Sequence, residues 1–414
     1  MEVDPVHLDG TTLEGGGQLL RVALALSSIF RTPIRVSRIR GKRGPKSAPG
    51  KDGGLKPAHL AAAQWLARAT AAATVGMELQ STELTFRPAS QSLSLGENSD
   101  EPVQVWQQIF DAGVLARQET HIRMSSPGSI ALILQAILPC LLLSSSSVPL
   151  WVTIAGGTNV SNSPSIDYVT EVFFPVLQSK LGINRIETSL NRRGWSTGRV
   201  EMGSVTFKFS PSQHGSGLPA FQLVNRGMVS SVRVTLLGHG ASLRQAVKSK
   251  LTQMLKDRLP AAEVHFVVEE DTGDSKKFYL LLVAQTEQGF RLGSDCLHVW
   301  KNSKKAGRTA NKSMSPEVDQ VHALLAKIME NFMTQIDRGG CVDEWMQDQL
   351  VIFQVLSNGP SSIDTGQLET SLHAQTARWV AQQLLEAQFD EHGEYQRRRA
   401  QISWPLFPDD ERDE

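Results

Sequence analysis

Apolar residues along the chain form three similar successions of predicted elements. Each succession begins with an apolar helix, continues with a short alternating strand and a loop, and closes with a second helix. The helices and strands predicted in this way are Leu19–Phe30, Pro33–Arg38 and Pro57–Ala73, then Ser129–Leu143, Leu150–Ala155 and Ile166–Leu181, then Glu344–Leu356, Ser361–Asp364 and His373–Ala387. The recurrence indicates three α/β modules packed around a common axis.

The stretch between the second and third successions has a different pattern, which predicts a strand, a helix and two further strands. These elements are Val229–Leu237, Ser242–Leu259, Glu263–Glu270 and Lys277–Ala284. We therefore expect residues 211–288 to form a small inserted α/β domain, with residues 1–210 and 289–395 forming the larger domain. Residues 396–414 end in DDERDE and are expected to be a partly disordered tail.

Composition narrows the class of protein. With 414 residues, no net charge and 40% apolar residues, the chain is typical of a globular protein of two or three domains. Its most apolar run, Ile130–Leu143, is interrupted by Gln135 and Pro139 and is too short to span a bilayer. We therefore expect no membrane segment, and the acidic N-terminus predicts no signal peptide.

Three cysteines, widely spaced along the chain, form neither a disulfide framework nor a metal-ligand spacing, so we expect a reducing compartment. The charge balance also conceals a local excess. The stretch Arg31–Lys56 is rich in Lys and Arg and has Asp52 as its only acid. Such a stretch indicates a surface that faces a polyanion, although a solvated loop is the alternative.

The most informative stretch is Leu8–Arg21, LDGTTLEGGGQLLR, at the entry of the first predicted helix. Glycines 15–17 allow a ligand to approach the backbone closely, and a helix N-terminus favours anions. Glu14 is suited to a divalent metal carried by a phosphate, and the guanidinium of Arg21 could reach the same anion. A capped helix start is the plainer interpretation of this stretch.

Further polar residues recur at the same end of each predicted module, where α/β proteins usually bind ligands. They are Arg40, Arg43, His59, Gln135, the GGTN segment 156–159, Trp345, Asp348, Gln349 and His373. Each also has a structural interpretation: a histidine at a helix start, a tryptophan in the core, or an aspartate in a surface ion pair. Their convergence on one end of the modules favours a binding site.

At these residues the chain resembles the RNA 3′-terminal phosphate cyclases. The motifs that carry the resemblance occur in the family's order and are LDGTTLEGGGQLLR, IRGKRG, GLKPAHL, GSIALILQAILP, GGTN…PSIDY, VDEWMQDQL and SLHAQTA. The resemblance implies an α/β (α+β) fold of three βαβαββ modules around a pseudo-threefold axis with a smaller inserted domain. It also implies a ligase that uses ATP to convert an RNA 3′-phosphate into a 2′,3′-cyclic phosphate.

The resemblance further implies a role for each candidate residue. His373 matches the family's nucleophile, which forms a covalent histidine–AMP before AMP passes to the RNA 3′-phosphate. Glu14 would bind Mg²⁺ or Mn²⁺, while Trp345 and Pro164 would enclose the adenine. The residues expected to contact the phosphates and complete the nucleotide pocket are Arg21, Arg40, Arg43, His59, Gln135, Asp348 and Gln349.

The chain departs from the family's pattern in four places. Ala58 replaces an amide side chain, and the loop Gly41–Gly54 is longer than usual. Glycines are also lost from the segments Gly194–Gly203 and Ser294–Asn302. These changes leave open a non-catalytic cyclase-like factor in ribosomal RNA processing, although His373 and the EGGGQ and DQL motifs favour an enzyme. An enolpyruvyl transferase is a third reading, but it would leave SLHAQTA unexplained.

The expected partner is RNA with a 3′-phosphate end. No membrane partner is expected, and both a monomer and a homodimer remain open. The basic stretch suggests the nucleus (nucleoplasm), with the cytoplasm as the other compartment, because RNA binding would explain the stretch equally well.

Overall fold

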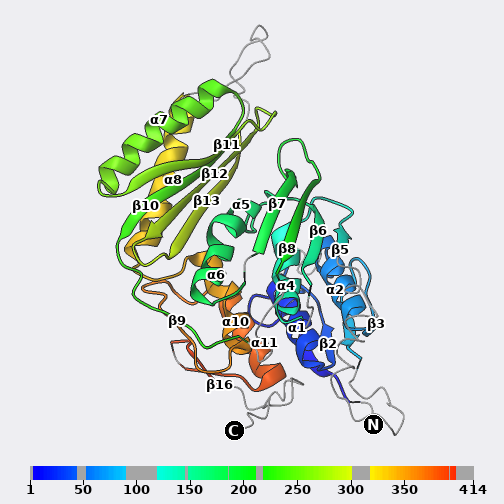
Figure 1. The fold of residues 1–414 in the computed structure, drawn as a ribbon. Coiled ribbons are helices and arrows are strands. Elements are labelled where there is room, and N and C mark those ends of the chain that lie inside the picture. Colours follow the sequence, from blue (N-terminus) through cyan, green and yellow to red (C-terminus); the bar gives the residue numbers. More distant parts are fainter. Residues whose placement is uncertain are drawn as a thin grey trace.

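The computed structural model describes residues 3–43, 53–89, 119–144, 148–184, 186–210, 218–300, 318–390 and 392–397. Most of the expected disordered tail and the middle of the basic stretch lie outside the described residues. The described part is a mixed α/β fold, as the sequence predicts (Figure 1). Within it, no helix combines the length and the apolar character that crossing a bilayer would require.

The first sheet is formed by the N-terminal segment and has the order β1-β2-β4-β3. Its elements are β1 (Val6–Asp9), α1 (Gly17–Phe30), β2 (Ile34–Ser37), α2 (Pro57–Ala69), β3 (Ala73–Val75) and β4 (Leu84–Arg87). β1 and β2 are parallel, while β4 is antiparallel to both β2 and β3. The apolar side chains of alternate strand positions, such as Ile34 and Phe86, are fully buried, which is why the strands alternate in sequence.

The second sheet repeats this order of elements and this pairing, as β5-β6-β8-β7. Its elements are β5 (Glu119–Arg123), α4 (Ile130–Leu142), β6 (Leu150–Gly156), α5 (Ile166–Tyr168), the π-helical turn η1 (Val169–Phe173), α6 (Phe174–Lys180), β7 (Ile186–Arg192) and β8 (Gly203–Phe209). The side chain of Ser129 accepts a hydrogen bond from the Leu132 amide and starts α4.

The third succession is formed by shorter strands. Its elements are β9 (Gln222–Leu223), α9 (Glu344–Gln349), α10 (Val351–Leu356), β14 (Ser362–Ile363), α11 (Leu372–Leu385), β15 (Gln388–Phe389) and β16 (Tyr395–Arg397). β14 is parallel to β9, β15 is antiparallel to β16, and a bridge from Ser361 to Tyr395 joins the two pairs. The arrangement of the three units around a pseudo-threefold axis stays a prediction.

An inserted unit lies between β9 and α9. Its elements are β10 (Val229–Gly238), α7 (Ala241–Arg258), β11 (Glu263–Glu270), β12 (Lys277–Thr286), β13 (Arg291–Val299) and α8 (Val318–Asp337). The strands form a sheet of order β11-β10-β12-β13, with α7 and α8 over one face (Figure 1). This second core extends to Ile336, whereas Gln288, the expected end of the insert, lies in the turn between β12 and β13.

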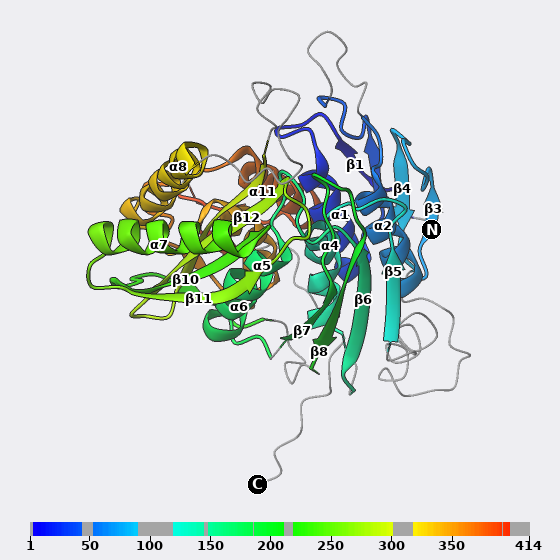
Figure 2. The same cartoon turned by 90° about the horizontal axis from the view of Figure 1, so that it is seen from above.

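Helices from all three successions meet in the main core. α1 packs against α2, α4 and α11, and Figure 2 shows α1, α2 and α4 lying side by side between the first and second sheets. α1 is buried from Gly17 to Ser28, because it packs against helices of all three successions and most of its residues are apolar. This packing brings the start of α1 next to α11, so that the candidates Glu14 and His373 lie close together.

Candidate active site

The glycines before α1 are required by the groups that surround them. Gly15 has a φ of +61°, which favours glycine. A Cβ on Gly16 would overlap the Glu14 carboxylate. A Cβ on Gly17 would lie 2.5 Å from Nε2 of His59 and 2.9 Å from Nη1 of Arg21. The glycine run therefore lets three polar side chains approach the beginning of α1.

Glu14 joins the start of α1 to α11. Its amide donates a hydrogen bond to Oγ1 of Thr376 (3.1 Å), and its Oε1 accepts one from Arg43 and lies 4.0 Å from Nδ1 of His373. The Glu14 side chain is only 4% exposed. Its other oxygen, Oε2, is buried and has no hydrogen-bond partner among the described residues. A buried carboxylate oxygen in this state is suited to a cation.

His373 lies in the first turn of α11 and is 47% exposed. The turn is fixed by Ser371, whose hydroxyl accepts a hydrogen bond from the Ala374 amide (3.1 Å). Partial burial and the positive charges of Arg21 and Arg43 lower the pKa of His373 to about 4. The imidazole is therefore neutral near pH 7, and one ring nitrogen has a lone pair available for attack.

His59 is a buried histidine at the start of α2. Its Nδ1 accepts a hydrogen bond from the Lys56 amide (3.3 Å), so the neutral ring has its proton on Nε2. Burial and the nearby charges of Arg21, Arg40 and Lys56 lower its pKa to about 3. Nε2–H is the atom that faces Gly17 and Arg21, where it is placed to donate a hydrogen bond to an anion.

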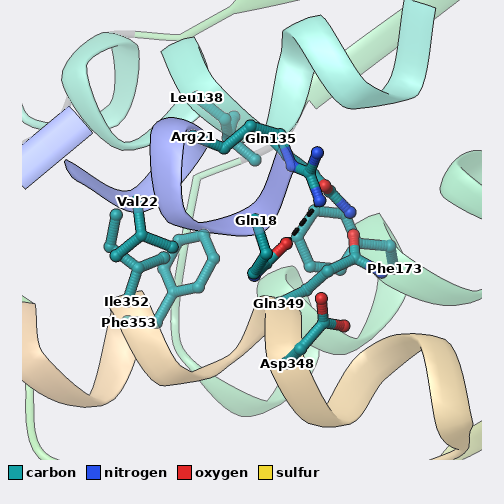
Figure 3. Close-up of a pocket in the computed structure, with 10 residues that line it drawn as sticks. All are labelled: Gln18, Arg21, Val22, Gln135, Leu138, Phe173, Asp348, Gln349, Ile352 and Phe353. Carbon is teal, nitrogen blue, oxygen red and sulfur yellow. Dashed lines mark hydrogen bonds between the residues drawn. The ribbon is translucent and has the colours of Figure 1, made fainter. Parts of the chain in front are cut away.

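A small cavity lies beside these residues, between α1, α4, η1, α9 and α10 (Figure 3). Its lining residues are Gln18, Arg21, Val22, Gln135, Leu138, Phe173, Asp348, Gln349, Ile352 and Phe353. Arg21 donates a hydrogen bond to Oε1 of Gln18, drawn dashed in Figure 3. The amide oxygens Oε1 of Gln135 and Gln349 are buried and have no hydrogen-bond partner within the described part of the chain. The cavity therefore combines apolar walls with polar groups that are incompletely satisfied, as is expected of a binding site without its ligand.

Two charged groups of the cavity have strongly shifted pKa values. Burial raises the pKa of Asp348 to about 7, although the charge of Arg21 opposes the shift. Burial lowers the pKa of Arg21 to about 10, an effect that Asp348 opposes and Arg40 reinforces. Shifts of this size are concentrated at functional sites.

Comparison with known proteins identifies the family to which this site belongs. The family model for RNA 3′-terminal phosphate cyclase matches residues 12–390. The chain belongs to the RNA 3′-terminal phosphate cyclase family. It is 28% identical to the probable RNA 3′-terminal phosphate cyclase of Dictyostelium discoideum over 376 residues, covering 89% of this chain and 74% of that protein.

Archaeal relatives align over a similar extent. The RNA 3′-terminal phosphate cyclase of Korarchaeum cryptofilum is 28% identical over 390 residues, 93% of each chain. That of Sulfurisphaera tokodaii is 33% identical over 319 residues, which cover 76% of this chain and 80% of the relative. The similarity therefore extends through the inserted unit as well as the main core.

The structure divides the predicted site residues of this cyclase family member into two adjoining groups. Glu14, Arg43 and His373 form the first group, and Arg21 and His59 adjoin it. Gln135, Asp348 and Gln349 line the cavity that also contains Arg21. Arg40 lies close enough to affect the pKa values of both Arg21 and His59.

Pro164 and Trp345, the residues expected to enclose adenine, lie at the starts of two helices. Pro164 is buried and immediately precedes Ser165, the N-cap of α5. Trp345 is partly buried in the first turn of α9, one turn before Asp348 and Gln349. Their roles in nucleotide binding stay predictions.

Three residues of the site were not predicted as site residues from the sequence. Gln18 and Thr376 could have been found, because each lies three residues from a predicted site residue on the same helix, Arg21 and His373. Asp295 could not have been found in this way, because no predicted site residue lies near it in the sequence. It belongs to β13 of the inserted unit, yet its Oδ1 accepts a hydrogen bond from the indole nitrogen of Trp345 (3.3 Å).

Proposed function

We propose that this protein is an ATP-dependent RNA 3′-phosphate cyclase that produces AMP and diphosphate, with His373 as its nucleophile. The observation that supports this most strongly is the position of His373. A half-exposed imidazole, kept neutral by partial burial and by two arginines, lies beside a buried glutamate with one unsatisfied oxygen. This combination suits nucleophilic attack on a phosphate that is neutralised by cations.

His373 begins the proposed reaction. Nδ1 faces Glu14, so Nε2 is the nitrogen left to attack the α-phosphorus of ATP. The new N–P bond replaces the bond to diphosphate, which leaves. An oxygen of the RNA 3′-phosphate then takes the AMP from the histidine. In the last step the ribose 2′-oxygen loses its proton and attacks the 3′-phosphorus, which closes the ring and releases AMP.

The remaining residues of the first group would stabilise charge. Arg21, Arg40 and Arg43 are proposed to contact the transferring phosphoryl groups, and Nε2–H of His59 to donate a hydrogen bond to them. Oε2 of Glu14 would ligate Mg²⁺ or Mn²⁺. The described residues contain no group of three His, Cys, Asp or Glu side chains placed to hold a metal alone. This fits an ion that would arrive bound to ATP, because the phosphates would then supply most of its ligands.

The second group is proposed to bind the nucleoside. The unsatisfied amide oxygens of Gln135 and Gln349 and the carboxyl group of Asp348 offer polar contacts. Trp345 and Pro164 are proposed to contact the two faces of the base. Because several relatives are archaeal, family membership gives no indication of a nucleus, and the proposed nuclear location rests on the basic stretch alone.

The activity can be tested with a short RNA that carries a fluorophore at its 5′ end, which phosphatase does not remove, and a phosphate at its 3′ end. Incubation with ATP and Mg²⁺ should make the 3′-phosphate resistant to phosphatase, as followed by electrophoretic mobility, and mild acid should restore its sensitivity by opening the cyclic phosphate. The same RNA with a 3′-hydroxyl is the matched control and should not change. RNA that binds but remains fully phosphatase-sensitive would contradict the proposal and favour the non-catalytic cyclase-like factor, which the change at Ala58 leaves open.

A further inference from the structure

One face of the inserted sheet packs on the main core. Tyr279, Leu281 and Val283 of β12 belong to the main core, while the alternate residues of the strand face α7 and α8. β13 packs against η1, and a Cβ on Gly293 would lie 2.8 Å from the ring of Tyr168. The insert therefore reaches the point where α5 and α9 begin.

A chain of hydrogen bonds crosses this contact. The indole nitrogen of Trp345 donates to Oδ1 of Asp295 (3.3 Å), and the hydroxyl of Tyr279 donates to Oδ2 of the same carboxylate (3.2 Å). The Tyr279 oxygen also lies 2.5 Å from Oγ of Ser165. Since the Tyr279 proton is used on Asp295, the Ser165 hydroxyl is the donor in that bond. Two residues of the insert thus connect α9 to the start of α5.

A second connection holds the same end of α9. Asp343, its N-cap, accepts hydrogen bonds from the Gly293 amide of β13 (2.7 Å) and from the Tyr168 hydroxyl (2.7 Å). It also accepts the Met346 amide (2.9 Å), which starts the helix. The backbone next to Trp345 is therefore fixed to β13, and the bond to Asp295 fixes the indole ring itself.

Asp295 has the charge state that this chain of bonds requires. Burial raises its pKa to about 6, against the effect of the Trp345 and Tyr279 donors. The carboxyl group is therefore mostly ionised above neutral pH, where each oxygen accepts one of the two hydrogen bonds.

We propose that the inserted domain supplies two positioning residues for the nucleotide base, Asp295 and Tyr279. They fix the orientation of Trp345 and its separation from the Pro164–Ser165 segment, the two sides expected to enclose the base. This inference rests on the proposed function, because it assumes that ATP binds there. It gives the insert a part in nucleotide affinity that does not require the insert to touch the nucleotide.

The test is the equilibrium binding of α,β-methylene-ATP with Mg²⁺ to the full-length protein by calorimetry, since this analogue cannot transfer AMP. Asp295→Leu leaves the indole N–H without an acceptor and should weaken binding by roughly tenfold. Asp295→Asn keeps an acceptor for the indole and should stay within about twofold of the wild type. Glu263→Leu removes an exposed carboxylate of the same sheet and should have no effect.

A double variant separates positioning from general packing. Phenylalanine has no N–H, so in a Trp345→Phe background the further change Asp295→Leu should weaken binding by less than about twofold. A full tenfold loss in that background, or unchanged binding in folded Asp295→Leu protein, would overturn the inference. If Asp295→Leu does not fold, Tyr279→Phe serves instead, with a loss of about threefold expected and an unchanged affinity contradicting the inference.

Failure of the proposed function would look different in the same experiment. Wild-type protein that binds no analogue would refute nucleotide binding and with it this inference. Wild-type binding that none of the insert variants weakens would refute only the role of the insert.

Discussion

Burial and neighbouring charged residues together determine the protonation of the candidate nucleophile. Partial burial of His373 disfavours the imidazolium most, and the positive charges of Arg21 and Arg43 disfavour it further. His59 experiences the same effects more strongly because it is fully enclosed. Both histidines are therefore neutral at a pH at which an ordinary histidine would be partly charged.

We expect the imidazole of His373 in the ligand-free protein to titrate with a pKa of about 4. Arg43→Gln removes one of the charges that lower this pKa, so the value should rise toward the ordinary 6.5. An NMR titration of the ring protons checks this, with the signal assigned from its absence in His373→Ala. Arg35→Gln, which changes an exposed residue paired with Glu83, is the control. A wild-type pKa near 6.5 would contradict the electrostatic account.

The same shifts have a consequence for stability. The folded-state pKa values of His59 and His373 lie below those of the unfolded chain, so the unfolded chain binds more protons between the two values. Their contribution to the free energy of unfolding is therefore greatest above the ordinary histidine pKa. It decreases as the pH falls from about 6.5 toward the folded-state values.

Among the elements, α1 shows how much the site depends on glycine residues, which leave room for neighbouring side chains. Alanine in place of a helical glycine usually stabilises a protein by about 1 kcal/mol. At Gly17 the added methyl group would instead displace His59 and Arg21. We expect Gly17→Ala to destabilise the protein by about 1–3 kcal/mol and to weaken nucleotide binding, measured by urea unfolding and calorimetry.

Gly238→Ala is the matched control, because its new methyl group would make only ordinary contacts, the nearest at 3.5 Å. Its free energy of unfolding should stay within about 0.5 kcal/mol of the wild type. A Gly17→Ala protein that is more stable than the wild type and binds nucleotide normally would show that the crowding at the start of α1 has no consequence.

The sequence predicted those helices and strands well whose own residues have a clear hydrophobic pattern. α1, α4, β6 and β10 agree with their predicted ranges to within a few residues, because long apolar stripes or strict alternation specify them. Motifs mark Glu14 and His373 as candidates, and the structure places their side chains 4.0 Å apart. The bond between Asp295 and Trp345 could not be predicted, since it joins residues fifty positions apart on elements whose contact depends on the packing of the insert.

Across the whole molecule, Arg193 is one of several residues that connect the insert to the main core. Its guanidinium donates two hydrogen bonds to Asp167 of α5 (2.8 and 2.9 Å) and two to Glu270 of β11 (2.6 and 3.0 Å). The side chains of Arg193 and Asp167 are only 12% and 7% exposed. Removal of the guanidinium would leave the Asp167 carboxylate buried without its cation.

We therefore expect Arg193→Ala to lower the free energy of unfolding by about 3–5 kcal/mol, because one partner of a buried ion pair is lost. Arg35→Ala, which breaks an ion pair more than half exposed on both sides, should cost less than about 1 kcal/mol. Thermal unfolding of the two variants provides the comparison. Equal, small losses would show that the buried pair of Arg193 and Asp167 contributes no more than an exposed one.

The central claim, that His373 is the residue that receives AMP, can be tested without RNA. Wild-type protein and His373→Ala are incubated with α-³²P-labelled ATP and Mg²⁺ or Mn²⁺, denatured and separated by electrophoresis. We predict an acid-labile label on the wild type and none on the variant, as expected for a phosphorus–nitrogen bond at this imidazole. Equal labelling of both proteins, or no labelling of a folded wild type that still binds RNA, would contradict the account.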